Sequence, residues 1–312
     1  MAEVWVMGEM LVEIMREKED VPLDALGLFR GPFPSGAPAI FIDTVARLGH
    51  QAGIIGGVGK DDFGKNLLDR LRKDGVDVSQ VLESEDNSTG VAFVTYFSDG
   101  SRKFIFHMGN TPAVEAKAPA AEVLDGVKYF HIMGCSLMPS KSFAREILKT
   151  MKLAVSKGAK ISFDPNIRKE LLKDDSVSEV VAEVINHTNV FLPGVEELIG
   201  ITGKDRIEDA VAACFENDKL EILALKNGSK GCTIYTREET LQMGVYSVEQ
   251  KDPTGAGDSF DGAFIAGLLA GHPLRQAAQM AAAAGALNAA EFGPMEGKIN
   301  QDTINAMIRS NT

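Results

Sequence analysis

Short apolar runs and amphipathic segments alternate along most of the chain. Residues 3–8 and 52–59 are almost continuously apolar, which predicts buried strands, while residues 61–75 place Phe63, Leu67, Leu68 and Leu71 at the spacing of one helix face. Further strands are expected at 127–134, 160–164, 189–193 and 221–226, and helices at 37–50, 140–157, 176–187, 256–271, 273–290 and about 300–310. This alternation predicts an α/β fold with a mainly parallel sheet covered by helices on both faces.

The pattern changes to strict alternation in one excursion from this scheme. Residues 90–97 and 102–107 flank Asp99-Gly100, a strong β-hairpin signal. We expect residues 13–35 and 88–110 to form a small antiparallel β-sheet, and residues 1–12, 36–87 and 111–312 to form the α/β domain. So small a sheet cannot build its own core, so it is expected to act as a lid whose second face is buried in a homodimer.

Composition narrows the class of protein. The 312 residues are 45% hydrophobic and carry a formal net charge of −12, which argues against nucleic acid or an anionic membrane as partner. Cys135, Cys214 and Cys232 are far apart and lack metal-ligand spacing, as expected of reduced thiols. The first residues lack a basic segment typical of a signal peptide, and no apolar run suits a membrane span. A cytoplasmic protein is predicted.

A glycine-rich turn, KDPTGAGDSFDGAF at 251–264, leads directly into an apolar helix. A helix start with unpaired amides attracts anions, so Asp258 is either a favourable first-turn charge or a group that works beside a bound phosphate. The P-loop pattern is absent, and the Gly255-x-Gly257 run lacks the context of a dinucleotide-binding turn. A helix cap with close glycine packing is the plain alternative.

That turn resembles the C-terminal signature of the ribokinase-like (PfkB) carbohydrate kinases, and GGVGKDDFGKNLLDRLRKDGVD at 56–77 resembles their N-terminal signature. The resemblance covers essentially the whole chain. It implies a three-layer αβα domain with a β lid, and phosphoryl transfer from ATP with Mg²⁺. By the same resemblance, Asp258 is the general base, and the N–H groups of Gly255, Ala256 and Gly257 form an anion hole.

Two further stretches are similar to parts of the family's ATP site. LKNGSKG resembles a strand and turn that border the nucleotide, which implicates Lys226, Gly228 and Gly231, although an ordinary turn would have the same sequence. Asn288 falls where relatives often line the adenine pocket, but a helix-face asparagine is more commonly plain surface.

The resemblance also implies metal ligands. Glu197, in LPGVEEL, matches a glutamate that organises Mg²⁺ through water, while Gly194 replaces the family's asparagine. Asp252 and Thr254 fall where relatives hold a monovalent cation such as K⁺.

The sugar end departs from the family pattern. Gly36 and Ala37 match, Glu13 replaces a common aspartate, and Ser35 and Ile40 replace a glycine and an asparagine. FDPNIR is similar to 2-keto-3-deoxygluconate kinases and fructokinases, and its Arg168 could pair with a sugar-acid carboxylate. Met108 stands where those relatives usually carry arginine. His107 is either a substrate contact or structural.

Together these observations predict an ATP-dependent kinase acting on a primary hydroxyl of a small sugar or sugar acid. The leading substrate is 2-keto-3-deoxygluconate; fructose, a related ketose or ribose is the alternative, and a nucleoside is less favoured. The departures at Ile40 and Gly194 keep a non-catalytic sugar or nucleotide sensor open as a rival class.

Overall fold

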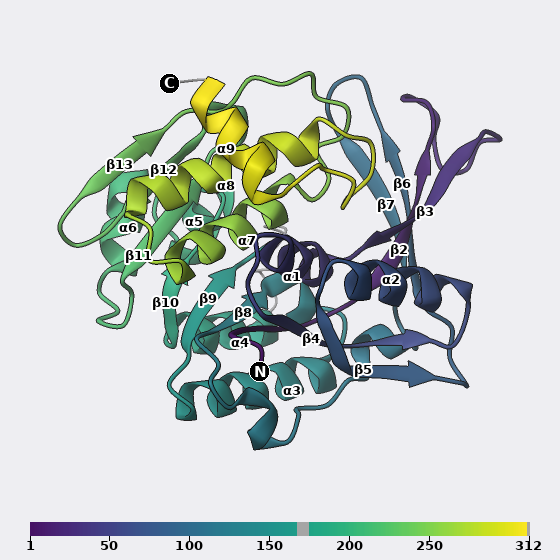
Figure 1. Cartoon of the computed structure of the whole chain (residues 1–312), viewed down its shortest axis with the longest axis horizontal. Helices are drawn as coiled ribbons and strands as arrows, with labels where there is room; N and C mark the ends of the chain where they lie inside the picture. Colours follow the sequence, from purple (N-terminus) through teal and green to yellow (C-terminus); the bar gives the residue numbers. More distant parts are fainter. Residues whose placement is uncertain (167–174, 311–312) are drawn as a thin grey trace.

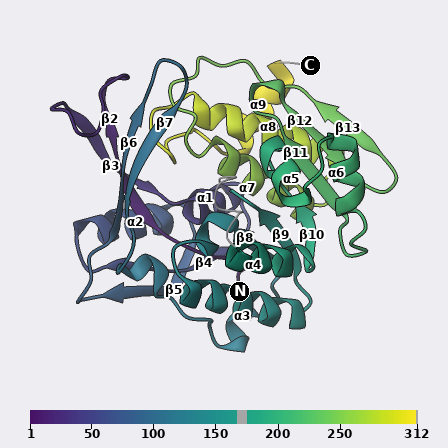
Figure 2. The same ribbon diagram turned by 180° about the vertical axis from the view of Figure 1, so that it is seen from behind.

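The computed structural model describes residues 1–166 and 175–310. Figure 1 shows a layered α/β body with a small, separate sheet projecting from one side, and Figure 2 shows the same arrangement from behind. The predicted fold class is confirmed. No helix in the described ranges combines the length and apolar character needed to cross a membrane.

The large sheet has the strand order β13-β12-β11-β10-β9-β8-β1-β4-β5. All neighbours from β11 to β5 pair in parallel, whereas β12 and β13 add an antiparallel hairpin at one edge. The strands are β1 (Val4–Met7), β4 (Ala52–Gly59), β5 (Asp77–Ser84), β8 (Tyr129–Met133), β9 (Lys160–Asp164), β10 (Thr188–Phe191), β11 (Ile222–Lys226), β12 (Cys232–Tyr235) and β13 (Thr240–Met243).

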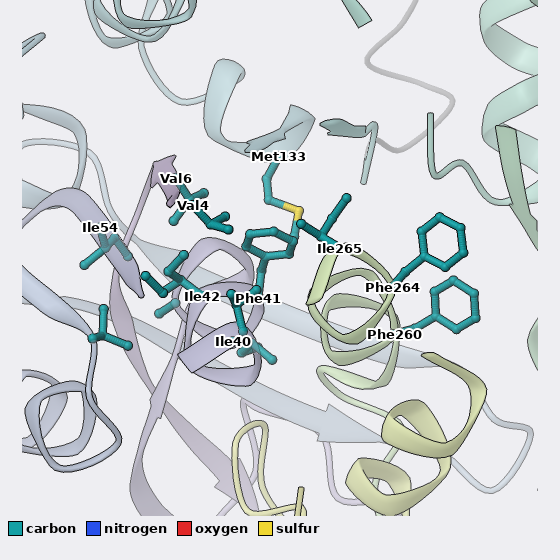
Figure 3. Packing of buried hydrophobic residues seen from close by; sticks show 14 of the residues in the cluster. Val4, Val6, Ile40, Phe41, Ile42, Ile54, Met133, Phe260, Phe264 and Ile265 are labelled. Atoms are coloured by element: carbon teal, nitrogen blue, oxygen red, sulfur yellow. The ribbon is translucent and has the colours of Figure 1, made fainter. Parts of the chain in front are cut away.

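Both faces of the sheet are buried, which explains the continuous apolar runs. Along β1, Val4 and Val6 belong to one core cluster, and Trp5 and Met7 belong to the other. The first cluster packs against α1 (Ala37–Arg47), α2 (Asp62–Lys73), α7 (Ala256–Leu269) and α8 (Leu274–Ala289), and Figure 3 shows it between α1 and α7. The second packs against α3 (Lys141–Ser156), α4 (Asp175–Ile185), α5 (Val195–Thr202) and α6 (Ile207–Cys214).

The small sheet, called the lid here, joins two hairpins in the order β3-β2-β6-β7. Its strands are β2 (Leu11–Arg16), β3 (Phe29–Ser35), β6 (Gly90–Tyr96) and β7 (Arg102–His107). The hairpins are antiparallel as predicted, but β2 and β6 pair in parallel where they meet. The two hairpins come from separate excursions of the chain, so no tight turn fixes the relative direction of β2 and β6.

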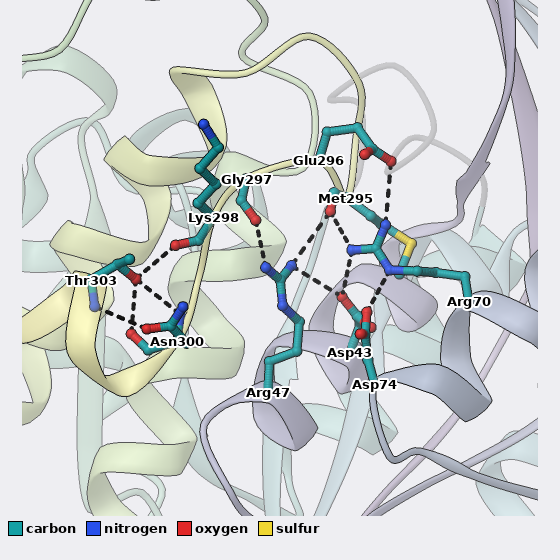
Figure 4. A network of polar contacts seen from close by, with 10 residues as sticks. All are labelled: Asp43, Arg47, Arg70, Asp74, Met295, Glu296, Gly297, Lys298, Asn300 and Thr303. Atoms are coloured by element: carbon teal, nitrogen blue, oxygen red, sulfur yellow. Dashed lines mark hydrogen bonds and ion pairs between the residues drawn. The ribbon is translucent and has the colours of Figure 1, made fainter.

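A network of arginines and carboxylates fastens the segment after α8 to α1 and α2 (Figure 4). Arg47 donates to the Gly297 carbonyl at 2.7 Å, and Arg70 donates to the Met295 carbonyl. Arg70 also pairs with Asp43 at 3.4 Å. Burial raises the pKa of Asp43 to about 7. From there the chain reaches α9 (Gln301–Ser310), which packs on α8. This anchoring matters for the site because Pro294 contacts the loop that starts α7.

Candidate active site

The glycine-rich turn begins α7 with a geometry that only glycine adopts readily. Gly255 caps the helix with φ 76°, and a Cβ there would lie 2.4 Å from the Pro294 carbonyl oxygen. Among the described residues beyond the backbone of α7 itself, a Cβ at Gly257 would come within 4 Å of the Lys226 Nζ alone, at 4.0 Å. The backbone at Gly257 is therefore open to a ligand.

Two cavities flank the start of α7. The first, called the sugar-side cavity, has a volume of about 630 Å³ and lies between the lid and the carboxyl ends of the parallel strands, where α/β sheets commonly bind ligands. It is lined by Glu9, Leu11, Glu13, Ser35, Gly36, Ala37, Ile40, Arg102, Phe104, Phe106, Met108, Gly109, Cys135, Met138, Pro139, Asn166, Glu197, Thr254, Gly255 and Asp258.

The second, called the nucleotide-side cavity, has a volume of about 540 Å³. Gly228, Gly231 and Gly244 form one wall, and Val245, Tyr246, Phe260, Ala282, Ala286 and Ala289 give it apolar surface. A Cβ at Gly228 or Gly244 would meet nothing within 4 Å, so the glycine wall leaves room for a bulky group. The apolar surface suits a flat ring such as adenine.

The α7 start separates these cavities. Thr254, Gly255 and Asp258 line the sugar side, whereas Ala256 and Gly257 line the nucleotide side. Among the described residues, no carbonyl outside the helix accepts the N–H of Gly255 or Gly257, while Ala256 donates to the Pro253 carbonyl at 3.3 Å. The predicted anion-hole residues are thus together, with Gly255 and Gly257 more available than Ala256.

Asp258 occupies the first turn of α7 and is only 8% exposed. Asn166 Nδ2 donates to its Oδ1 at 3.2 Å. Burial, aided by the negative charge of Asp164, raises the pKa of Asp258 to about 7, although Lys226 and Arg102 oppose the shift. A carboxylate with that pKa is well matched to proton removal near neutral pH.

Glu13 enters the sugar-side cavity from β2. Ser35 Oγ donates to its Oε1 at 2.7 Å, while Oε2 is buried and accepts no hydrogen bond from the described residues. Burial raises the pKa of Glu13 to about 7. Ser35, which departs from the family pattern, thus orients the glutamate, and Oε2 is available to a sugar hydroxyl. Gly36 and Ala37 line the same cavity, and Ile40 gives it an apolar wall.

The lid strand β7 presents other residues than those predicted. His107 is exposed and packs edge-on against Phe93, and it does not line the sugar-side cavity. Arg102, Phe104 and Phe106 line it instead, because alternate residues of a strand face the same side. Arg168, the predicted carboxylate partner, lies outside the described residues.

Glu9 and Cys135 were not predicted as cavity residues. Glu9 follows β1 and is 5% exposed. Its carboxylate accepts hydrogen bonds from Cys135 Sγ, at 3.2 Å, and from Ser136 Oγ. Burial raises the pKa of Glu9. The polar pair Gly8-Glu9 after an apolar strand was the available signal, because it places a charged residue at the carboxyl end of the sheet.

Of the residues expected at the ATP site, Lys226, Gly228 and Gly231 line the nucleotide-side cavity. Asn288 does not. It is 1% exposed beneath the α7 loop, where its Nδ2 donates to the Thr254 carbonyl at 2.7 Å. Gly285, Ala286 and Ala289 of the same helix line the cavity in its place.

Glu197 lines the sugar-side cavity from the first turn of α5, where its Oε2 accepts the Gly194 N–H at 2.7 Å. The described residues hold no group of three or more acidic, histidine or cysteine side chains able to bind a metal. A lone carboxylate nevertheless fits Mg²⁺ delivered with phosphates, since this ion keeps several waters and takes few protein ligands.

The oxygens expected for a monovalent cation already have protein donors. Asp252 accepts Tyr96 Oη at 2.7 Å, the Thr254 N–H at 2.9 Å and the Gly293 N–H at 3.0 Å. The Thr254 carbonyl oxygen accepts a hydrogen bond from Asn288, and the Thr254 hydroxyl contacts Tyr96 Oη. These donors leave a lone pair on Asp252 Oδ2 and on the Thr254 carbonyl oxygen, so the monovalent-cation site at Asp252 and Thr254 stays a prediction.

Comparison with known proteins establishes the family. The model of the pfkB family carbohydrate kinases matches residues 1–301, and the chain belongs to this family. It is accordingly a carbohydrate kinase. Fructokinase-2 of Solanum lycopersicum is 33% identical over 263 residues, 83% of this chain and 79% of the relative. The protein named Probable fructokinase-4 of Arabidopsis thaliana is 29% identical over 316 residues, 97% of this chain and 96% of the relative.

A solved structure covers the whole fold at higher identity. A candidate ribokinase II from E. coli is 39% identical and covers 99% of this chain and 100% of its own, with a TM-score of 0.95 without ligand. Its complex with ATP and Mg²⁺ has a TM-score of 0.94. The relatives named fructokinase favour the alternative substrate over 2-keto-3-deoxygluconate, which none of these comparisons supports.

Proposed function

We propose that this sugar kinase transfers the γ-phosphoryl group of ATP to a primary hydroxyl of a neutral ketose, with fructose the first candidate. The observation that carries the proposal is the position of the α7 start between the two cavities, with Asp258 facing one and the Gly257 backbone facing the other. A hydroxyl in the sugar-side cavity and a phosphate at the helix start would both reach this junction.

Different residues remove the proton and stabilise the negative charge. Asp258 takes the proton of the attacking hydroxyl, and Asn166 holds its carboxylate in place. The N–H groups of Gly255 and Gly257 at the helix start stabilise negative charge on the transferred phosphoryl group, with Ala256 as a weaker donor. Mg²⁺, when bound with ATP, supplies positive charge to the phosphates, and Glu197 would hold it through water.

The charges of the sugar-side cavity support a neutral substrate. Glu9, Glu13, Glu197 and Asp258 line it, against Arg102 as the one cation among its described residues. Carboxyl groups accept hydrogen bonds from sugar hydroxyls but disfavour a sugar acid. Relatives named fructokinase provide the second support.

The test is a panel of fructose, ribose, 2-keto-3-deoxygluconate and a nucleoside, each with MgATP, in which ADP release and the phosphorylated product are both measured. We expect fructose to give the highest kcat/KM and Asp258→Asn to abolish turnover while it still binds ATP. A sugar acid as best substrate would contradict the proposed specificity. Absence of any product would favour the sensor alternative.

A cytoplasmic location is proposed as well, and the three free cysteines are compatible with it.

The lid is proposed as a dimer contact. Leu26 and Leu28 are 102% and 72% exposed in the loop before β3, and Ile105 is 42% exposed on β7. Such apolar surface favours association. Mass measurement in solution should give about twice the chain mass for the native protein and a monomer for Leu28→Glu/Ile105→Glu; a native monomer would contradict the dimer.

A further inference from the structure

A buried cluster of three charged side chains lies behind the α7 start. Lys226 Nζ is 2.8 Å from Asp164 Oδ2 and 2.9 Å from Asp261 Oδ2. The side chains are 17%, 4% and 0% exposed, respectively. The first two residues end the parallel strands β11 and β9, and Asp261 follows Asp258 by one turn of α7.

The cluster touches both halves of the site. Lys226 lines the nucleotide-side cavity, and its Nζ lies 4.0 Å from the position that a Gly257 Cβ would occupy. In the other direction, Asp164 Oδ1 accepts the Asn166 N–H at 3.2 Å, and Asn166 in turn donates to Asp258. The ammonium group therefore lies beside the open backbone at which a phosphate would bind.

The geometry leaves part of the ammonium group available. A lysine ammonium has three N–H donors. Asp164 takes one, and the two oxygens of Asp261, at 3.1 and 2.9 Å, lie on one side of Nζ and share another. The third can then point toward the cavity that Lys226 lines.

The charge of the cluster also suits an anionic ligand. Burial raises the pKa of Asp261, while the neighbouring Lys226 lowers the pKa of Asp164. The two carboxyl groups therefore differ in how readily they ionise beside the Lys226 ammonium group. A bound phosphoryl group would face the Lys226 ammonium group, which the contacts with Asp164 and Asp261 hold in place.

We propose that Lys226 is a catalytic residue whose third N–H donates to the transferred phosphoryl group, and that Asp164 and Asp261 are the positioning residues that aim it. This rests on the proposed kinase function and deepens it. In the step, the bond from the γ-phosphorus to the bridging oxygen of ADP breaks, and a bond to the sugar oxygen forms. The hydroxyl proton passes to Asp258. Lys226 transfers no proton; it stabilises charge that grows as the old bond breaks.

Two variants test the proposal without leaving an unpaired buried charge. Lys226→Met/Asp164→Asn removes the ion pair as a unit, and Asp261→Asn removes an acid of the same shape. We expect the double variant to lower kcat at least about 100-fold and Asp261→Asn about 10-fold. The KM for sugar and the affinity for a non-hydrolysable ATP analogue should change less than about threefold, because the contact strengthens in the transition state.

Lys160→Met is the matched control, since Lys160 pairs with Glu221 at the other end of β9, away from both cavities. It should leave kcat unchanged. Thermal unfolding identifies any variant that fails to fold. If the double variant does not fold, the kcat of the milder Asp261→Asn variant tests the proposal. A folded double variant, or a folded Asp261→Asn, with kcat within about threefold of the native enzyme would overturn the proposal. If the native protein phosphorylates no sugar, the proposed function itself fails, which is a distinguishable result.

Discussion

At the residue scale, the site depends on carboxyl groups whose burial moves their pKa into the neutral range. Asp258 and Glu13 both reach about 7. The charged groups facing Asp258 are Asp164, Lys226, Arg102 and Glu9. A base must be deprotonated to act, so kcat/KM should rise with pH through about 7 and level off above it. A pH–rate profile in a salt-matched buffer series measures this.

Glu13→Gln separates the two groups. If Glu13 must also be ionised, the native profile falls with a slope of two on its acid side, and the variant falls with a slope near one. An acid side centred below about pH 5 in both proteins would contradict the role of buried Asp258 as base, because that is the range of an ordinary carboxyl group.

At the element scale, the start of α7 contains two glycines, Gly255 and Gly257, at which a side chain would have different consequences. Gly255 adopts a positive φ, and a Cβ there would clash with the Pro294 carbonyl oxygen. A Cβ at Gly257 would face open space. Gly255→Ala should destabilise the fold by about 1 kcal/mol or more. Gly257→Ala should leave the fold as stable as before and raise the KM for ATP about tenfold, which corresponds to about 1.4 kcal/mol.

Thermal unfolding and steady-state kinetics on this pair supply the measurement. Equal losses of stability in both variants, or an unchanged KM for ATP in Gly257→Ala, would show that the Gly257 backbone does not face the nucleotide.

The elements that the sequence predicts well are those with unambiguous periodicity. Strands β1 and β4 are continuous apolar runs, and α2 buries the apolar face expected of it. Helices α5 and α6 span only eight residues each, too short for a clear helical period, and were not predicted. Edge strand β5 was missed because it is half exposed. Both roles of His107 were left open because sequence cannot tell which side of a lid strand faces the cavity; its position outside the cavity lining favours the structural role.

At the scale of the whole molecule, the site is assembled from segments that sequence alone does not bring together. Glu9, Cys135 and Asn166 follow β1, β8 and β9, which are adjacent strands of one sheet, so their side chains converge although they are far apart in the chain. The glycine-rich turn at 251–258 and its carboxylate Asp258 could be predicted from a sequence motif. The Lys226 cluster could not, because its pairing depends on strand order and on the rotation of α7.

The lid is joined to the α7 loop by a contact that crosses the molecule. Tyr96 of β6 donates to Asp252 at 2.7 Å, and Phe33 of β3 packs edge-on against Phe292, next to Gly293, whose N–H also binds Asp252. The position of the lid and the position of the loop that starts α7 are thus coupled through the carboxylate of Asp252. A hydrogen bond contributes about 0.5–1.5 kcal/mol, so we expect its loss to loosen this link between the lid and the loop.

Tyr96→Phe should therefore raise the KM for sugar about tenfold, corresponding to about 1.4 kcal/mol, while the affinity for ATP stays nearly unchanged because the nucleotide-side cavity has no lid residue. Tyr129→Phe is the control: this tyrosine is also buried, but it begins β8 at the opposite end of the sheet. Steady-state kinetics with each substrate varied in turn measures both constants. The coupling is absent if Tyr96→Phe binds sugar as the native enzyme does, or if it weakens sugar and ATP equally, since an equal loss would indicate general loosening of the fold.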